Sequence, residues 1–196
     1  MLLAIDVGNT NLVLALGDEA GAIEARWRIE TSVITSEAAC EAELRSTLGD
    51  AASRVDDAII ASVVPDVTPR LEAAIRAVTG VAPLIVGAPS VDLGIAVNID
   101  NPAQAGADRL VNAVGAMAHH HLPAILLDFG TATTLDLVAE DGTYEGGIIA
   151  PGVALSIEAL ERASAQLPRL VLRSFEADLP VLGKNTVAAM ETGVLW

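Results

Sequence analysis

The chain has 196 residues, of which 52% are apolar and only 3% aromatic. This composition suits one compact domain, or two small packed domains, with a core of Ala, Val, Leu and Ile. The 11 basic and 26 acidic residues give a formal net charge of −15, which opposes binding to nucleic acid or to an anionic membrane. A single cysteine, Cys40, excludes an internal disulfide and predicts a reducing, cytoplasmic location. No segment approaches the roughly 20 apolar residues of a membrane span.

The first part of the chain predicts a hairpin followed by alternating strands and helices. A helix is expected over 36–49, with Ser36 as its cap and Gly49 after its end. A second helix is expected over 68–80, with its cap at Thr68, because proline follows at the first helical turn and glycine ends the pattern. The expected strands are residues 2–6, 11–17, 22–31, 56–65 and 82–87.

The second part repeats this order. A loop rich in Asn, Pro and Gly (98–109) leads into a helix that extends to residue 121. Strands follow within 123–130, 131–142 and 143–152. A helix then starts near Pro151 and ends at about Gln166, and a last helix starts within 183–196. The repeated order predicts an α/β protein with an internal duplication and two domains, residues 1–119 and 120–196.

The same turn opens each predicted domain. "LLAIDVGNTN" (2–11) and "AILLDFGTAT" (124–133) are both apolar runs that end in Asp, any residue, then Gly. Glycine lets the backbone approach a ligand closely, and the N–H groups of such a turn form a concavity for phosphate oxygens. The aspartate would meet phosphate only through a metal ion or its water. A single Asp-x-Gly is equally consistent with an ordinary turn that binds no ligand. Two of them at matching positions predict a cleft that holds a polyphosphate from both sides.

Asp108 and Arg109 follow the glycine-containing loop at the start of a predicted helix. Phosphoryl transfer needs a group that accepts the hydroxyl proton, and a carboxylate is stabilised at a helix N-terminus. The guanidinium fork of Arg109 suits a carboxylate or a phosphate. The plainer alternatives are an N-terminal helix residue for Asp108 and a surface salt bridge for Arg109. His119, His120 and His121 receive no role as metal ligands, since consecutive helix residues point in different directions. Lys184 receives none either, because a lysine at a helix start is often simply solvated.

Four segments together resemble the type III pantothenate kinases, the family also called Bvg accessory factor homologues, within the superfamily of acetate and sugar kinases and actin. They are residues 100–116, 127–138, 146–170 and 183–193. The resemblance implies a duplicated actin-like (ribonuclease H-like) ATPase fold. It also implies ATP-dependent phosphorylation of pantothenate to 4′-phosphopantothenate, the first step of coenzyme A biosynthesis, by a cytoplasmic homodimer.

The resemblance also assigns residues to roles. Asp108 would be catalytic. Asp128 would hold a monovalent cation, K⁺ or NH₄⁺, and Asp6 is a candidate for holding Mg²⁺ through water. The substrate-binding set would be Gly106, Ala107, Asp108, Arg109 and Thr186, with Thr186 reaching pantothenate across the dimer interface. The ATP-binding set would be Asp6, Val7, Gly8, Asn9, Thr10, Asn11, Leu12, Val13 and Thr131.

Two features depart from the family pattern. Some members carry a substrate-contacting tyrosine nine residues before the catalytic aspartate, where this chain has Ile99. The family also continues past the position of Trp196, which predicts an incomplete second domain and a poor kinase. Two further hypotheses therefore stay open: a non-catalytic regulator, and a related small-molecule kinase with another acceptor. Phosphate transfer from ATP, measured with several acceptors, separates the three.

Overall fold

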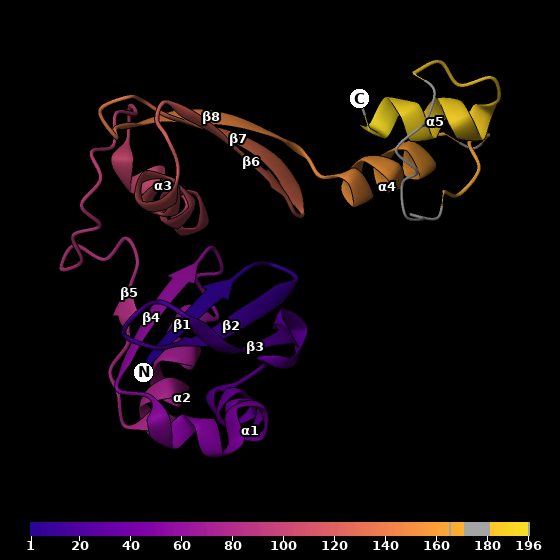
Figure 1. The fold of residues 1–196 in the computed structure, drawn as a ribbon. Helices are drawn as coiled ribbons and strands as arrows, with labels where there is room; N and C mark the ends of the chain where they lie inside the picture. The colour runs from indigo at the N-terminus through magenta and orange to yellow at the C-terminus, as the bar shows by residue number, and fades with distance from the viewer. Residues whose placement is uncertain (165, 171–180, 196) are drawn as a thin grey trace. The chain divides into compact units, whose positions relative to one another are not determined.

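The computed structural model describes residues 1–164, 166–170 and 181–195 (Figure 1). It is an α/β protein, as the sequence predicts. The chain forms two compact units, one of Met1–Ala124 with Val138–Gly146 and the other of Ile125–Leu137 with Gly147–Trp196. The expected domains 1–119 and 120–196 stay a prediction. No helix in the described part of the chain is long and apolar enough to cross a membrane.

The first unit contains a five-stranded sheet in the order β3-β2-β1-β4-β5. Strand β1 is antiparallel to β2 and parallel to β4, so the sheet has the ribonuclease H-like arrangement expected from the sequence. Strand β3 is antiparallel to β2, and β5 is parallel to β4. The strands are β1 (Leu2–Val7), β2 (Asn11–Gly17), β3 (Ile23–Glu30), β4 (Asp57–Ser62) and β5 (Leu84–Ile85).

The two faces of this sheet are covered by different helices, and apolar residues at alternate strand positions contact each of them. The leucines of β2 at alternate positions, Leu12, Leu14 and Leu16, are buried in one cluster with residues of α1 (Glu37–Leu48) and α2 (Thr68–Thr79). Figure 1 shows these two helices beside each other on one side of the sheet. On β4 the side chains of Ile59 and Ala61 belong instead to a second cluster with α3 (Ala107–His119). Helix α3 therefore covers the opposite face, because successive strand residues point to opposite sides.

The N-terminal cap predicted from the sequence is confirmed for α1 and wrong for α2. The hydroxyl of Ser36 accepts a hydrogen bond from the amide of Ala39 at 3.1 Å, so the expected cap of α1 is confirmed. The expected cap at Thr68 is wrong, since Val67 is the cap residue of α2 and already has helical dihedral angles. The chain enters α2 from a turn in which the amides of Val67 and Thr68 both donate to the carbonyl of Val64. The hydroxyl of Thr68 accordingly points backward and donates to that same carbonyl at 3.1 Å.

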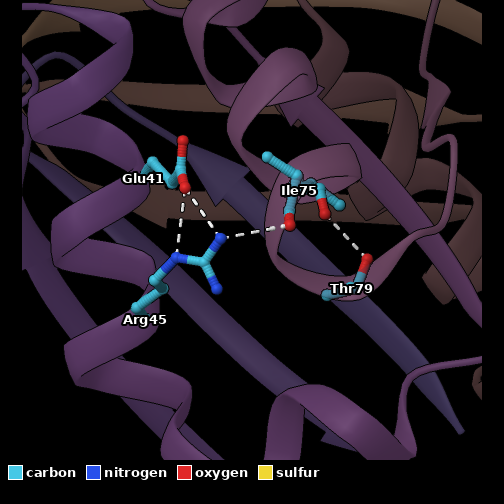
Figure 2. Close-up of polar contacts among 5 residues, drawn as sticks. Glu41, Arg45, Ile75 and Thr79 are labelled. Atoms are coloured by element: carbon cyan, nitrogen blue, oxygen red, sulfur yellow. Dashed lines mark hydrogen bonds and ion pairs between the residues drawn. The ribbon is translucent and has the colours of Figure 1, made fainter.

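A polar contact joins α1 to α2 (Figure 2). Nη2 of Arg45 lies 2.7 Å from Oε1 of Glu41, one turn earlier on α1, and also donates to the carbonyl oxygen of Ala77 on α2 at 3.3 Å. The hydroxyl of Thr79 donates to the carbonyl of Ile75 at 2.8 Å and satisfies one acceptor in the last turn of α2. The two helices thus form one layer under the sheet.

The remaining elements form a three-stranded sheet, in the order β6-β7-β8, and two further helices. The strands are β6 (Ala124–Phe129), β7 (Ala132–Val138) and β8 (Tyr144–Pro151), and the helices are α4 (Val153–Ala163) and α5 (Thr186–Leu195). Short 3-10 turns lie earlier in the chain, at Thr31–Val33, Gly49–Arg54 and Pro102–Gln104. Two expected helix ends are wrong: α3 ends at His119 and α4 at Ala163, because His120 and Ser164 both have extended backbone. The predicted last helix reaches Trp196, which lies outside the described residues.

Candidate functional site

The first Asp-x-Gly turn joins β1 to β2. The amide of Gly8 donates to the carbonyl oxygen of Asn11 at 2.9 Å, and a Cβ on Gly8 would lie 3.3 Å from that same oxygen. Asp6 is exposed and lies directly opposite Val13 in the β1–β2 register. The side chains of Val7 and Leu12 are fully buried in the core. A ligand could therefore reach these two residues only through their main chain.

Thr31 fixes this turn from the end of β3, and sequence reasoning missed it. Its amide donates to the carbonyl of Thr10 at 2.9 Å, and its hydroxyl donates to the carbonyl of Gly8 at 2.7 Å. The side chain is only 8% exposed. The signal was in the strand register: β3 pairs with β2 so that Glu30 lies opposite Asn11, which places the following residue beside the turn.

The second Asp-x-Gly turn joins β6 to β7 and lies in the other compact unit. Asp128 and Thr131 are both exposed. The amide of Gly130 donates to the carbonyl of Ala132 at 2.9 Å, and the amide of Gly152 donates to the carbonyl of Thr131 at 3.0 Å. A Cβ on Gly152 would lie 2.5 Å from that carbonyl oxygen and would also collide with the carbonyl of Gly130. Only glycine at position 152 fits this arrangement.

Each turn is thus held by an amide that comes from elsewhere in the chain. Thr31 donates to Thr10 in the first turn, and Gly152 donates to Thr131 in the second.

Beyond the second turn, Asp136 on β7 is only 1% exposed. Sequence reasoning gave Asp136 no role, although a carboxylate within the apolar stretch "TLDLV" was a visible signal.

Four of the five substrate-binding residues expected from the sequence, Gly106 to Arg109, lie at the start of α3. Gly106 is the cap residue and Asp108 lies in the first turn. Oδ1 of Asp108 accepts a hydrogen bond from the amide of Arg109 at 2.8 Å. A Cβ on Gly106 would lie 2.5 Å from the same Oδ1, so glycine leaves the space that this carboxylate occupies. Ala107 is buried against β4 and can offer a ligand only its main chain.

Tyr144, at the start of β8, lies under Arg109. Cζ of Arg109 is 5.8 Å from the centroid of the tyrosine ring, and the tyrosine is 0% exposed. Sequence reasoning missed this residue too. The only signal was its rarity, since Tyr144 is the one tyrosine of a chain that is poor in aromatic residues.

Thr186, the fifth expected substrate-binding residue, belongs to the other compact unit. It is exposed at the first residue of α5, where Oδ1 of Asn185 accepts a hydrogen bond from the amide of Ala188 at 2.9 Å. It lines an open groove of about 650 Å³. The other residues along this groove are Leu160, Leu167, Gly183, Lys184, Asn185, Ala189, Met190 and Gly193.

A cation held by Asp6 or Asp128 would need further ligands beyond the described side chains of this chain. Among residues 1–164, 166–170 and 181–195, no group of three or more His, Cys, Asp or Glu side chains could hold a metal ion. A cation at Asp6 or Asp128 would take its other ligands from water, the main chain or phosphate oxygens. Mg²⁺ is usually bound in this way, through one or two carboxylates and the substrate's phosphates.

Cys40 takes no part in this chemistry. It is fully buried between the sheet and α1, and burial raises the pKa of its thiol to about 11. A thiol with a raised pKa is a poor nucleophile at neutral pH. The interpretation of Cys40 as core filler therefore agrees with its surroundings.

Comparison with known proteins places this architecture in one family. The family described as type III pantothenate kinase matches residues 2–196. The type III pantothenate kinase of Phenylobacterium zucineum is 46% identical over 199 residues, which cover 100% of this chain and 76% of that protein. That of Caulobacter vibrioides is 44% identical over 201 residues, with coverage of 100% and 75%. A solved structure described as a conserved putative Baf family transcriptional activator from Campylobacter jejuni superposes with a TM-score of 0.59. At 14% identity, over 98% of this chain and 73% of that one, it shows a shared fold alone.

Proposed function

Because this chain belongs to the type III pantothenate kinase family, we propose that its two Asp-x-Gly turns hold the phosphates of ATP while the start of α3 presents the acceptor and the base. The reaction is ATP-dependent phosphorylation of pantothenate at its primary hydroxyl, which yields 4′-phosphopantothenate and ADP. It is the first step of coenzyme A biosynthesis. The cytoplasm, which supplies ATP, is the compartment we propose for it.

The position of Asp108 carries this proposal. A kinase of this type needs a carboxylate that accepts the hydroxyl proton while the oxygen attacks the γ-phosphorus and the bond to ADP breaks. Asp108 lies in the first turn of α3, where the helix dipole favours a negative charge. Its Oδ1 is oriented by the amide of Arg109, and Gly106 leaves room for it. The carboxylate is therefore held in one place before any substrate binds.

The two turns supply the donors for the triphosphate. In the first, the main chain of the turn within Asp6 to Val13 and the exposed side chains of Asn9 and Thr10 would supply the donors. In the second, Thr131 is exposed beside Asp128. We assign Mg²⁺ to Asp6, through water, and a monovalent cation, K⁺ or NH₄⁺, to Asp128. The bound cations would neutralise phosphate charge.

Arg109 and Thr186 complete the proposed acceptor site. The guanidinium of Arg109 suits the carboxylate of pantothenate, because it offers two parallel N–H donors. Thr186 would reach the substrate from the partner subunit of a homodimer. Its exposure on an open, partly apolar groove supports this assignment. Sedimentation velocity tests the dimer, and a monomer at all protein concentrations would contradict it.

The test of the function is an ADP-release assay with a panel of acceptors. The chain is expected to consume ATP slowly with pantothenate, and not with sugars, acetate or glycerol. Turnover with another acceptor but not with pantothenate would replace the proposed substrate. ATP binding without turnover on any acceptor would instead favour a non-catalytic regulator.

Asp108→Asn tests the mechanism, because the amide keeps the shape of the side chain and loses the proton acceptor. A loss of kcat of about 10²–10⁴-fold is expected, with the Kd for ATP unchanged. The matched control is Asp50→Asn, an exposed aspartate in the turn after α1, which should keep full activity. An Asp108→Asn variant with more than half of the wild-type rate would remove Asp108 from the mechanism.

A further inference from the structure

The guanidinium of Arg109 lies over the ring of Tyr144. The distance of 5.8 Å from Cζ to the ring centroid lies within the range of an attractive cation–π contact. The tyrosine is completely buried, and Nη2 of Arg109 is buried as well. Such contacts are stronger when water is excluded from them.

The tyrosine itself is fixed by its main chain. Its amide donates to the carbonyl of Ala96 at 2.8 Å, and its carbonyl accepts from the amide of Asn98 at 2.8 Å. In addition, Nδ2 of Asn98 donates to Oε2 of Glu145 at 2.7 Å. The segment that contacts Tyr144 in this way is the one that runs on into Gly106 and α3. The ring is therefore anchored to the same loop that ends in the proposed acceptor site.

A free arginine side chain populates many rotamers, and selecting one of them costs entropy when a ligand binds. Contact with a completely buried ring limits the positions that the guanidinium can occupy. The planar guanidinium fork binds a carboxylate through two parallel N–H donors. We propose that Tyr144 is a positioning residue that holds Arg109 ready for the carboxylate of pantothenate, an inference that rests on the function proposed above.

The competing explanation is that Tyr144 only fills space between β8 and α3. The two explanations differ in what they predict for pantothenate. Loss of a positioning ring weakens pantothenate binding through Arg109 and leaves ATP binding and kcat intact. Loss of a space-filling ring lowers the melting temperature, and any effect on binding would not depend on Arg109.

The experiment uses Tyr144→Leu, which removes the ring, and Tyr144→Phe, which keeps it. Pantothenate Kd is measured by titration calorimetry, and KM and kcat by ADP release. Tyr144→Leu should raise the Kd and KM for pantothenate about three- to thirty-fold, the range that corresponds to a partly desolvated cation–π contact. Its kcat and its KM for ATP should change less than about two-fold. Tyr144→Phe should bind pantothenate like the wild type.

A double-mutant cycle with Arg109→Gln shows whether Tyr144 acts through the arginine. In the Arg109→Gln background, Tyr144→Leu should cause no further loss of pantothenate affinity. Equal losses in both backgrounds would overturn the inference, and so would an unchanged Kd in Tyr144→Leu. If Tyr144→Leu lowers the melting temperature, Tyr144→Met is compared in its place, since an unbranched side chain adapts to the same space. A wild-type chain that binds pantothenate without turnover would contradict the proposed function and leave this test intact. A chain that binds no pantothenate would overturn both.

Discussion

The amide of Gly152 donates to the carbonyl oxygen of Thr131 at 3.0 Å, which fixes the residue before α4 against the second Asp-x-Gly turn. The approach is so close that a Cβ at position 152 would meet the carbonyl oxygens of both Thr131 and Gly130. These are main-chain atoms, so a larger side chain cannot be accommodated by a rotamer change. The conformation of the turn and the start of the helix therefore depend on each other.

Gly152→Ala should lower the free energy of unfolding by about 1–3 kcal/mol, the usual cost of forcing atoms into a filled space. It should also weaken ATP binding, because Thr131 would move. Chemical denaturation and calorimetric ATP titration measure the two effects. The control is Gly115→Ala on α3, where an added Cβ meets nothing within 4 Å, and which should stabilise the chain by up to about 1 kcal/mol. Identical unfolding of the two variants would contradict this reading of the turn.

Asp128→Ala should make the rate indifferent to potassium. If Asp128 holds a monovalent cation near the phosphates, its loss removes positive charge from the place where negative charge develops. The rate is followed against potassium concentration at constant ionic strength, with sodium as the replacement ion. Glu140→Ala, at an exposed acid just after β7, serves as the control and should keep the wild-type response. A potassium dependence that survives in Asp128→Ala would place the cation elsewhere.

Thr31→Val should loosen the first turn, since valine has the shape of threonine but cannot donate to the carbonyl of Gly8. A hydrogen bond of this kind contributes about 0.5–1.5 kcal/mol, so the Kd for ATP should rise about two- to ten-fold. Thr31→Ser keeps the hydroxyl and should remain close to the wild type. If valine and serine affect ATP binding equally, the hydroxyl does not brace the turn.

The stability of the chain should fall as the pH rises from 9 towards 11, in part through Cys40. Burial raises the pKa of this thiol from 9.0 to about 11, so the folded state favours the protonated form. The contribution is fully present below pH 9 and is lost as the pH rises through the folded pKa. It amounts to on the order of 2 kcal/mol. Urea denaturation at several pH values measures it, and Cys40→Ala should show a shallower decline. Parallel declines in both proteins would rule out the thiol as the cause.

The elements of the first sheet could be predicted because their signals are local. Apolar runs around the first Asp-x-Gly turn predict β1 and β2, and Ser36 with Gly49 marks the ends of α1. The same reasoning placed the cap of α2 at Thr68, which is wrong. The chain enters α2 from a turn, so the residue before the helix has helical rather than extended backbone. A cap signal assumes an extended approach, which short-range sequence patterns do not reveal.

The supporting residues of the site could not be predicted in this way. Thr31 contacts Gly8 across 23 positions of sequence, and Tyr144 lies under Arg109 across a longer separation. Both contacts depend on the register of strands, which a one-residue slip would change completely. The residues proposed to touch ligands carry recognisable motifs, whereas the residues that contact them are ordinary threonines, glycines and tyrosines.

The alternation of burial along the first hairpin also governs how a mutational survey of this protein should be interpreted. Val7 and Leu12 lie within the stretch proposed to bind the nucleotide, yet both side chains are completely buried in the core. Substituting either one would deplete the folded population, and an activity screen would score that loss as a nucleotide-binding defect. Asn9 and Thr10 are exposed, so their substitution changes the ligand surface without emptying the core. Variants at such exposed positions change ligand binding without changing the amount of folded protein, so only they report on the ligand site itself.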